Sequence, residues 1–532
     1  MGYQLFAVTL LRFLNNPTLL LKIFAVAQEQ IKPIHPESMR LISKSLSLID
    51  KDFRNKPEHA ELFVKMLRNK RAVAWVLRRM SASGVLGRYL PEFGRIIGQS
   101  QHDLFHIFTV DEHTLQAVEA LRKIKRKEFS SELPLATQIM ENIRDPLVLI
   151  LSILLHDIAK GQGGYHQDKG AIIADKICRR LQLPNAEIAK VVWLVKKHLI
   201  FSRTAFRMDI GDPETVARFV TEIGNVENLK LLLLLTITDI IAVGPGVWTP
   251  WKASLLRQLY NLTLEALEKG EFKPEGMVLQ ANMRRREAVA LLSNDYTKEQ
   301  LEAHFNRFSP DYFLHYDAKI LAEHFIALAP HLNEPLAIIF RWEEDSDTTE
   351  LLLHTQDHPG LIATVSGVLA AEGTNILSAN ITTSKDGMAL DIFIFQNTQG
   401  KAIQNQRRLD RIEKNITSLL EGKICLDSLM TKSTMAEPAP KHFRIPVDIR
   451  VDNSFETFTL LEVTALDRIG LLYNITRVLQ KQGIQILTAK ISSYGEKAVD
   501  VFYIKDLFGL KLGKRKIESI SKNIKESIEK LD

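Results

Sequence analysis

The sequence has only two cysteines, Cys178 and Cys425, in 532 residues. Their scarcity excludes a disulfide scaffold and a cysteine-rich zinc site, and it is typical of proteins in the reducing cytoplasm. Long hydrophobic runs are also absent. The two most apolar segments, 147–155 and 231–243, are shorter than the ~20 residues that cross a bilayer, so they predict buried helices and no membrane span.

An excess of one charge sign is missing as well, because 69 basic residues face 63 acidic ones and the net charge is +6. This balance does not indicate a nucleic-acid partner. Two basic runs, 122–127 and 514–516, contain no aromatic side chains that would stack on bases, so solvated helix surface is the favoured interpretation. Hydrophobic residues make up 45% and charged residues 25%, which is typical of a globular protein.

Hydrophobic periodicity divides the chain into a helical part and a mixed part. Up to about residue 340 the apolar residues recur at helical spacing, including a helix predicted over 61–80, whereas strand and helix patterns alternate after the acidic run 343–347. The predicted fold class is multidomain, with an all-α region followed by two α+β domains. The predicted ranges are a helical lead-in (1–100), a helical domain (101–250), a helical extension (251–340) and two mixed domains (349–430 and 457–532).

The last third of the chain contains an internal repeat with an offset of 110 residues. Asp357 and Gly360 of the first copy align with Asp467 and Gly470 of the second. Each copy reads strand, Asp-x-x-Gly turn, helix, two strands joined by a hairpin, and a final helix. This order, with Asp-x-x-Gly-Leu after the first strand, resembles the ACT domain, a ferredoxin-like module that binds small effectors.

The ACT resemblance implies amino-acid binding at the Asp-x-x-Gly turns. The glycine permits the tight turn into the helix, and the free backbone N–H groups at the helix start can meet a carboxylate. The implied effector-binding residues are Asp357, Gly360 and Asn375 in the first copy, and Asp467, Gly470 and Gln485 in the second. The residues alone leave open a structural role, in which the aspartate caps the helix and the glycine forms the turn.

Histidine and aspartate recur on helices and at helix ends between residues 110 and 240. The set is His113, His156, Asp157, His166, His198 and Asp239. Imidazole with carboxylate suits Mn²⁺, Fe²⁺ or Zn²⁺, and carboxylate with water suits Mg²⁺. Such ligands can converge from facing helices inside a bundle. A single histidine on an apolar helix is more often structural, but Asp239 stands among leucines and isoleucines, where an unpaired carboxylate would be costly.

The order of these residues resembles the HD-domain metal phosphohydrolases. The resemblance implies a metal held by His113, His156, Asp157 and Asp239, with His166 and His198 as ligands of a second metal or as contacts to phosphate. The predicted catalytic residues are His156, Asp157 and Lys160. Because Lys160 follows His156 by four residues, we expect both on one helical face, where the lysine charge could hold a phosphate oxygen.

The surrounding sequence is more specific than the metal ligands. Segments 84–93, 155–161 and 239–252 resemble the family of bifunctional uridylyltransferase and uridylyl-removing enzymes that act on the nitrogen-regulatory PII protein. That family joins a nucleotidyltransferase domain, a helical linker, an HD domain and two ACT domains. Its transferase carries a Gly-Ser turn followed by an Asp-x-Asp pair, and no such combination precedes residue 100. Transferase activity is therefore expected to be absent.

The family resemblance implies a hydrolase that removes UMP from a tyrosine of uridylylated PII, with Mg²⁺ or Mn²⁺ as the metal that activates water. Glutamine bound to the ACT pair is expected to stimulate the reaction. Two other functions stay open. Hydrolases of guanosine tetraphosphate also join HD and ACT modules, although usually with one ACT copy. A glutamine sensor or PII-binding regulator without turnover is the other alternative.

Overall fold

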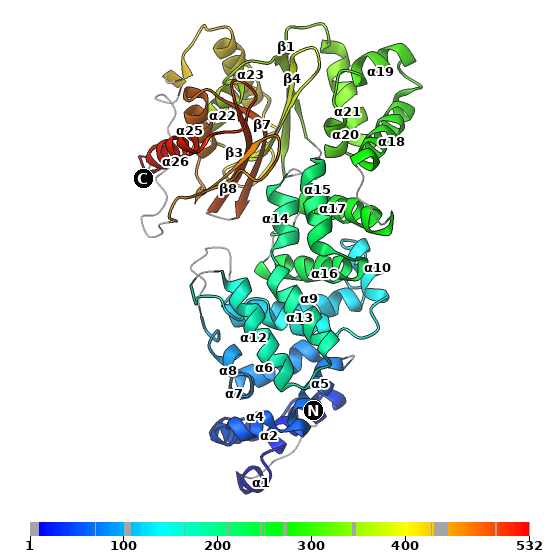
Figure 1. Ribbon diagram of the computed structural model, residues 1–532, viewed down its shortest axis with the longest axis vertical. Coiled ribbons are helices and arrows are strands. Elements are labelled where there is room, and N and C mark those ends of the chain that lie inside the picture. Colours follow the sequence, from blue (N-terminus) through cyan, green and yellow to red (C-terminus); the bar gives the residue numbers. More distant parts are fainter. Residues whose placement is uncertain are drawn as a thin grey trace. The chain divides into compact units, whose positions relative to one another are not determined.

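The computed structural model describes residues 10–69, 71–99, 108–163, 165–208, 210, 212–244, 247–248, 250–269, 274–342, 347–426, 428–429, 445–494 and 497–530. Contacts divide the chain into two compact units, one of Met1–Arg203 with Val220–Glu268 and one of Thr204–Phe219 with Lys269–Asp532. The first unit is helical, and the second combines helices with one sheet (Figure 1). The predicted fold class, a helical region followed by two α+β domains, is confirmed.

Helices make up the described part of the first unit. In chain order they are α1 (Leu10–Asn15), α2 (Leu19–Gln30), α3 (Pro36–Lys44), the 3-10 turn η1 (Leu46–Leu48), α4 (Lys51–Asn55), α5 (Pro57–Arg68), α6 (Val73–Ala82), α7 (Val85–Tyr89), α8 (Pro91–Gly94), α9 (Val110–Lys125), α10 (Pro134–Glu141), α11 (Leu147–Leu155), α12 (His166–Arg180), α13 (Asn185–Lys197), α16 (Val226–Val243) and α17 (Pro250–Lys269). Helices α14 (Ile200–Arg207) and α15 (Pro213–Ile223) cross the division between the units.

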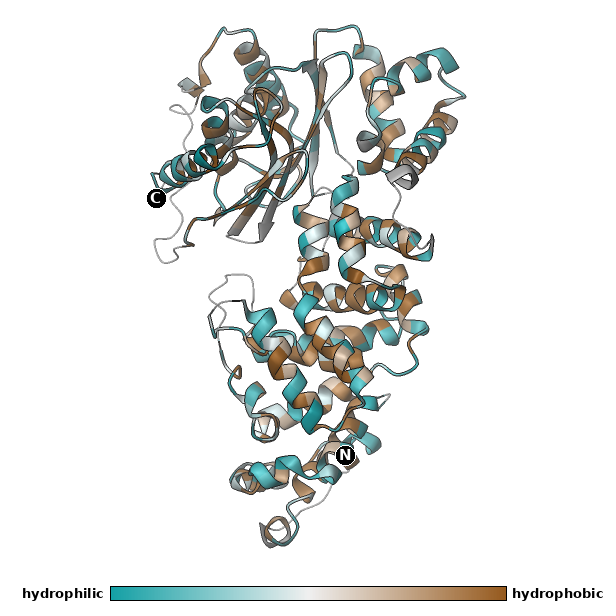
Figure 2. Cartoon of the chain, in the orientation of Figure 1, coloured by the Kyte–Doolittle hydropathy of each residue, from teal (hydrophilic) through white to brown (hydrophobic). Residues whose placement is uncertain are grey.

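Two helices without a polar face form the centre of the first unit. In α11 every residue except Val148 is buried. Asn225 caps the start of α16, because its side chain accepts a hydrogen bond from the Asn228 N–H. The helix buries residues on several sides. Such helices must be covered by others, and Figure 2 shows hydrophobic residues prevailing on α16 and its neighbours. Among the described residues no helix is long and apolar enough to cross a bilayer.

The prediction of one helix over residues 61–80 is wrong, because the structure has two helices there. Helix α5 ends at Arg68 and α6 begins at Val73. Ala72 precedes α6 with a φ of 55°, and a residue in this left-handed conformation cannot continue a right-handed helix. Each helix still buries an apolar face, which includes Phe63 in α5 and Leu77 in α6.

The second unit begins with helices and continues with the two repeat copies. Its helices before the sheet are α18 (Pro274–Leu292), α19 (Lys298–Phe305), α20 (Pro310–His315), α21 (Ala318–Leu328) and the 3-10 turn η2 (Ala329–His331). The first copy contains β1 (Leu336–Arg341), β2 (Thr349–Gln356), α22 (Leu361–Ala371), β3 (Thr374–Thr383), β4 (Met388–Asn397) and α23 (Gln406–Leu420). The second contains β5 (Asp448–Asp452), β6 (Thr459–Leu466), α25 (Leu471–Lys481), β7 (Ile484–Tyr494), β8 (Lys497–Asp506) and α26 (Lys514–Glu529).

The two copies share one antiparallel eight-stranded sheet in the order β1-β2-β4-β3-β7-β8-β6-β5. At its centre β3 pairs with β7 through Ala379 and Ala489, which are equivalent residues of the repeat. The equivalent hydroxyl groups of Ser366 in α22 and Thr476 in α25 lie 3.4 Å apart. Because equivalent residues meet each other, the copies are related by an approximate twofold axis. The repeat predicted from the sequence is therefore confirmed.

One hydrophobic core runs through both copies and holds their helices against one face of the sheet. It contains Phe393 and Phe502 from the strands, together with Ile412 of α23 and Ile524 of α26. A smaller cluster around Phe455, described below, lies apart from this core. Successive side chains along each strand point to opposite faces of the sheet, so only every second residue faces this core. The sheet is therefore a single folded body and not two independent modules.

The sheet starts earlier in each copy than the predicted ranges do. Strand β1 lies partly within the range 251–340, which was predicted to be helical, and it pairs with β2 from Leu336 opposite Thr355. Strand β5 precedes the predicted start at residue 457 and pairs with β6. Both strands are short and lie at the edges of the sheet. Each is held by pairing with the strand that follows it in the chain, and strand propensity depends strongly on such context. Most of the acidic run, residues 343–346, lies outside the described residues.

Candidate metal centre and effector pocket

Five helical segments of the first unit bring the six predicted metal-site residues together. His113 lies in α9 and Asp239 in α16, His156 and Asp157 directly follow α11, His166 is the first residue of α12, and His198 follows α13. His113, His156, Asp157 and His198 are buried, while His166 and Asp239 are about one quarter exposed. Four of the six side chains are thus out of water, although all of them are polar.

Two of the histidines are oriented by the same local contact at a helix end. Nδ1 of His156 donates to the Ile153 carbonyl at 2.7 Å, and Nδ1 of His198 donates to the Val195 carbonyl at 2.7 Å. A hydrogen bond on Nδ1 leaves Nε2 without its proton in the neutral ring, which is the form that binds metals. Both helix ends therefore present an Nε2 lone pair to the centre.

The side chains form two groups of three. In the first, Asp239 Oδ1 lies 2.9 Å from His113 Nε2 and 3.5 Å from His156 Nε2. In the second, Asp157 Oδ1 lies 3.5 Å from His166 Nε2 and 4.0 Å from His198 Nε2. Within each group the potential ligand atoms lie within 4.8 Å of one another. This spacing fits one metal ion in each group.

Asp157 connects the two groups. Its Oδ1 atom faces His166 and His198, whereas its Oδ2 atom lies 3.5 Å from His156 Nε2. A carboxylate with one oxygen toward each group can be shared by two adjacent cations. The arrangement thus fits a two-metal site of imidazole and carboxylate ligands, which suits divalent metals such as Mn²⁺, Fe²⁺ or Zn²⁺.

A buried nitrogen without a partner supports this interpretation. Nε2 of His156 is inaccessible to solvent and makes no hydrogen bond, although two carboxylates lie within 3.5 Å. Leaving a buried polar atom unsatisfied costs about 1–3 kcal/mol, and a metal ion would remove that cost. The donor set therefore fits a divalent metal on grounds of geometry and of unsatisfied polarity.

The charges in the centre favour a cation. Burial disfavours the charged form of His156, but the carboxylates of Asp157 and Asp239 outweigh burial and raise the pKa of His156 to about 9. Burial opposes ionisation of Asp239, but the hydrogen bond from His113 and the charge of the nearby His156 outweigh burial and hold the pKa of Asp239 well below its usual value. Burial and the neighbouring His156 lower the pKa of His198 to about 4. The two carboxylates thus create a negative potential in the centre. A divalent cation can neutralise it in place of the proton on His156.

The prediction that Lys160 shares a helical face with His156 is wrong. Helix α11 ends at Leu155, and the chain turns so that the Lys160 N–H donates to the Asp157 carbonyl at 2.9 Å. The lysine Nζ donates to Asp157 Oδ2 at 2.9 Å and is about one quarter exposed. Lys160 therefore pairs with the shared carboxylate at the edge of the centre. Its predicted contact to phosphate stays a prediction.

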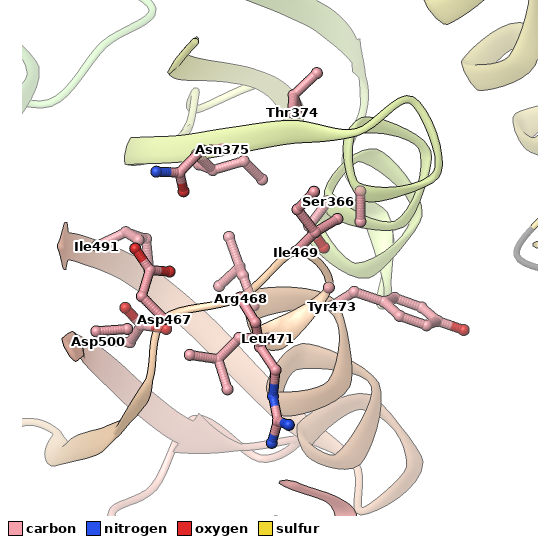
Figure 3. A pocket seen from close by; sticks show the side chains of 15 residues that line it. Ser366, Thr374, Asn375, Asp467, Arg468, Ile469, Leu471, Tyr473, Ile491 and Asp500 are labelled. Atoms are coloured by element: carbon pink, nitrogen blue, oxygen red, sulfur yellow. The ribbon is translucent and has the colours of Figure 1, made fainter. Parts of the chain in front are cut away.

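A second candidate site lies between the two repeat copies. The pocket has an empty volume of about 360 Å³, part of it open to solvent, and its lining includes Asn375 of β3, Asp467 and Gly470 before α25, and Asp500 of β8. Figure 3 shows Asn375 facing the adjacent carboxylates of Asp467 and Asp500, while the Arg468 side chain points away from them. The first copy thus supplies an amide to the pocket, and the second copy supplies two acids.

The pocket regroups the predicted effector residues. The sequence assigned Asn375 to a site with Asp357 and Gly360, but the structure puts it with Asp467 and Gly470 of the other copy. Gln485, the equivalent of Asn375, is exposed on β7. The physical reason is the twofold arrangement, because the helix of one copy packs beside the helix of the other and each Asp-x-x-Gly turn faces the opposite copy. The binding roles of these residues stay predictions.

Sequence reasoning missed Asp500 and its equivalent, Asp391. Each lies on the last strand of its copy and is 1% exposed. Burial raises the pKa of Asp500 well above its usual value, with a further contribution from Asp467, and burial with Asp357 does the same for Asp391. The alignment of an aspartate with an aspartate inside two apolar strands was the signal that could have found them.

Replacement of Asp391 by asparagine is expected to change how stability depends on pH. The folded pKa of Asp391 lies above its unfolded value, so the folded chain keeps a proton that the unfolded chain has lost. Wild type should therefore lose stability relative to Asp391→Asn as pH rises above about 4, by at most about 1.4 kcal/mol per pH unit. Urea unfolding at pH 4 to 8 measures this, and a pH-independent difference would contradict it.

Comparison with known protein families gives four matches in separate parts of the chain. The family model described as "Uridylyltransferase GlnD third domain" matches residues 4–89, and the HD domain model matches residues 110–242. The ACT domain model matches residues 349–403, and the model "ACR family N-terminal ACT domain" matches residues 454–531. An HD domain and two ACT copies are thus recognised in the order that the sequence predicted.

Relatives named "Bifunctional uridylyltransferase/uridylyl-removing enzyme" match nearly the whole chain. The protein of Azospirillum brasilense is 39% identical over 507 residues, and that of Rhodospirillum rubrum is 37% identical over 504. Each alignment covers 94% of this chain and 54% of the relative, so the chain spans about half the length of the curated relatives it matches. The predicted resemblance is thereby confirmed, and the chain is a homologue of the bifunctional uridylyltransferase/uridylyl-removing enzymes over that half of their length.

Proposed function

We propose that this chain is a cytosolic, metal-dependent hydrolase that removes UMP from a uridylylated PII-type signalling protein and responds to glutamine. The observation that carries the proposal is the pair of His/Asp groups that share Asp157. The names of the relatives and the match to the HD domain model support the same reaction class. The pocket between the two ACT copies supports regulation by an amino acid.

His113, His156, Asp157 and Asp239 are the residues that would hold Mg²⁺ or Mn²⁺, and Asp157 with His166 and His198 would hold a second ion. The bound metal lowers the pKa of a coordinated water and neutralises phosphoryl oxygens. In the hydrolysis, the water oxygen forms a bond to phosphorus, the bond from phosphorus to the tyrosine oxygen breaks, and a water proton ends on the tyrosine. Lys160 balances the charge of Asp157 at the edge of the centre.

Release of UMP from uridylylated PII tests the proposal. Purified chain is incubated with uridylylated PII, Mg²⁺ or Mn²⁺, and glutamine, and UMP is measured by chromatography. Guanosine tetraphosphate serves as a second substrate in parallel, because release of pyrophosphate would favour the alternative hydrolase. Absence of UMP release with both metals would contradict the proposal, and a protein that binds glutamine but no metal would favour the sensor without turnover.

Removal of the metal is expected to abolish hydrolysis and to lower the melting temperature. A ligand that binds only the folded chain stabilises it by about 2.7 kcal/mol at a hundredfold excess over its dissociation constant. Chelated protein should therefore melt earlier, and adding Mn²⁺ or Mg²⁺ back should restore both stability and UMP release. Differential scanning calorimetry follows the first effect without substrate. An unchanged melting temperature on adding either metal would argue against a site in the folded chain.

A further inference from the structure

The turn between β8 and α26 carries three large apolar side chains on the surface of the second unit. Leu507, Phe508 and Leu510 are 63%, 88% and 63% exposed, and Phe508 is the most exposed large hydrophobic side chain among the described residues. Single exposed apolar residues are normal on proteins, but three within four positions at one turn indicate a contact surface. These three residues are called the apolar tip below.

The equivalent turn of the first copy shows that the fold does not need apolar residues here. Asp506 and its equivalent, Asn397, hold the two turns by the same hydrogen bonds. In each turn the residue's N–H donates to the carbonyl four residues on, and its side-chain Oδ1 accepts from the N–H groups two and four residues on. The first copy has polar side chains at the positions of the apolar tip, namely Thr398, Gln399 and Lys401.

Positive charge surrounds the apolar tip. Five cations flank it in the sequence, namely Lys505 before it and Lys511, Lys514, Arg515 and Lys516 after it. Lys516 Nζ donates to the Gln482 carbonyl at 2.5 Å, and the next residue, Gly483, lies against the Leu507 side chain. These contacts hold the start of α26 beside the tip. None of the five cations forms an ion pair with a described residue, so their charge is available to an anionic partner.

An anionic lipid bilayer has the chemistry that suits this arrangement. Apolar side chains at the end of a turn can enter the hydrocarbon, while cations set back from them meet the negative head groups. The long lysine and arginine side chains can extend along the apolar surface to reach those groups. A stable protein interface needs about 800 Å² from each partner, which is much more than three side chains at one turn supply. The order of apolar tip and flanking charge therefore favours a membrane surface.

We propose that the chain binds peripherally to anionic lipid bilayers, with Leu507, Phe508 and Leu510 inserted into the membrane and the flanking cations on the head groups. Peripheral contact of this kind needs no membrane-spanning helix. The inference goes beyond the proposed hydrolysis and does not depend on it. It also gives a function to the basic run 514–516, which the sequence alone favoured as solvated helix surface.

Co-sedimentation of the full chain with lipid vesicles tests this. Wild type is expected to bind vesicles of phosphatidylglycerol and phosphatidylcholine in equal parts, and to bind pure phosphatidylcholine at least about tenfold more weakly. Leu507→Thr/Phe508→Gln/Leu510→Lys gives the turn the side chains of the first copy. It should lower binding to the anionic vesicles at least about tenfold, because burial of one leucine or phenylalanine is worth about that factor. The change adds a positive charge, so weaker binding cannot result from lost charge.

Two pairs of substitutions in α26 test the contribution of charge. Lys514→Gln/Arg515→Gln should weaken binding to the anionic vesicles about tenfold, since each cation near the surface contributes about 1 kcal/mol. Lys522→Gln/Lys525→Gln removes the same charge from the same helix, at lysines paired with glutamates, and should stay near the wild-type value. Melting temperatures identify any variant that fails to fold.

Four outcomes would overturn the inference. They are no binding of wild type to anionic vesicles, equal binding of wild type to both kinds of vesicle, undiminished binding by the triple variant, and a wild-type dimer that the triple substitution makes monomeric. The last result, measured by light scattering without lipid, would show that the apolar tip is an interface between two chains. Thr398→Ala/Gln399→Ala, at the equivalent polar turn, is the matched control and should bind vesicles as wild type does.

Discussion

A chain carrying His156→Ala and Asp157→Ala is expected to release UMP from uridylylated PII about a thousandfold more slowly than wild type. The double substitution removes the buried Nε2 of His156 and the carboxylate that faces both groups of ligands. Loss of a metal that stabilises charge in the transition state by about 4 kcal/mol corresponds to such a factor. Initial rates of UMP release, measured with saturating Mn²⁺ and glutamine, give the comparison.

Single substitutions separate the two groups of ligands. Asp157→Asn is expected to lower metal content in both groups, because one oxygen of Asp157 lies toward each. His166→Ala should affect only the group around His198. Metal per chain is measured by elemental analysis after dialysis. His331→Ala, at a half-exposed histidine of the second unit that pairs with Glu334, is the control and should keep wild-type content.

Two outcomes would contradict the site. An active double variant would show that the reaction does not need His156 or Asp157. Equal metal content in wild type and Asp157→Asn would show that the carboxylate is not a shared ligand. Since four of the six side chains are buried, melting temperatures must accompany these measurements, and a folded but inactive Asp157→Asn protein gives the cleanest support.

Replacement of Arg218 by alanine is expected to remove most of the stimulation by glutamine while leaving basal hydrolysis intact. Arg218 belongs to the segment Thr204–Phe219, which lies in the range matched by the HD model yet packs with the sheet in the second unit. Its guanidinium lies 4.0 Å from the centre of the Phe455 ring and donates to the Ser454 carbonyl at 2.9 Å.

The segment is suited to link the two sites because of where it begins and ends. Helix α14 starts two residues after His198 and reaches Arg207, whose Nη1 atom lies 3.5 Å from Glu462 in β6. Met208 packs against the cluster of Phe455, Phe458, Leu460, Val501 and Tyr503. A change in the second ACT copy on ligand binding would therefore be passed along α14 to His198, which is a predicted metal ligand.

The stimulation is the ratio of the hydrolysis rate with glutamine to the rate without it. Coupling between two sites is commonly about 5- to 150-fold, and the loss of stimulation in Arg218→Ala is expected to lie in this range. UMP release is measured at zero and saturating glutamine, and calorimetry confirms that glutamine still binds. Arg218→Lys should recover part of the response, because lysine keeps the charge but not the planar stacking. Arg179→Ala, at an exposed arginine paired with Asp175 on α12, is the control. Full stimulation in Arg218→Ala would contradict the coupling role.

Much of the fold was determined by local sequence patterns. Helical spacing predicted the first part of the chain, and the two apolar segments 147–155 and 231–243 became the buried helices α11 and α16. The repeat was visible because the Asp-x-x-Gly turn recurs at an offset of 110 residues. In the structure Gly360 and Gly470 both take the left-handed conformation directly before a helix, which glycine favours. These features depend on neighbours within a few residues, so a single sequence contains them.

Only the tertiary structure decided which polar residues meet. His113 and Asp239 are 126 positions apart and come within 2.9 Å because α9 and α16 pack together. Asn375 joins Asp467 and not Asp357 because the copies pack around a twofold axis. The edge strands β1 and β5 likewise depend on pairing with β2 and β6. Asp500 becomes buried only in the folded sheet, where its Oδ1 atom has no hydrogen-bond partner among the described residues. Chain spacing specifies local conformation, but the distance between residues far apart in sequence is set by the packing of whole helices and strands, where most burial energy is gained.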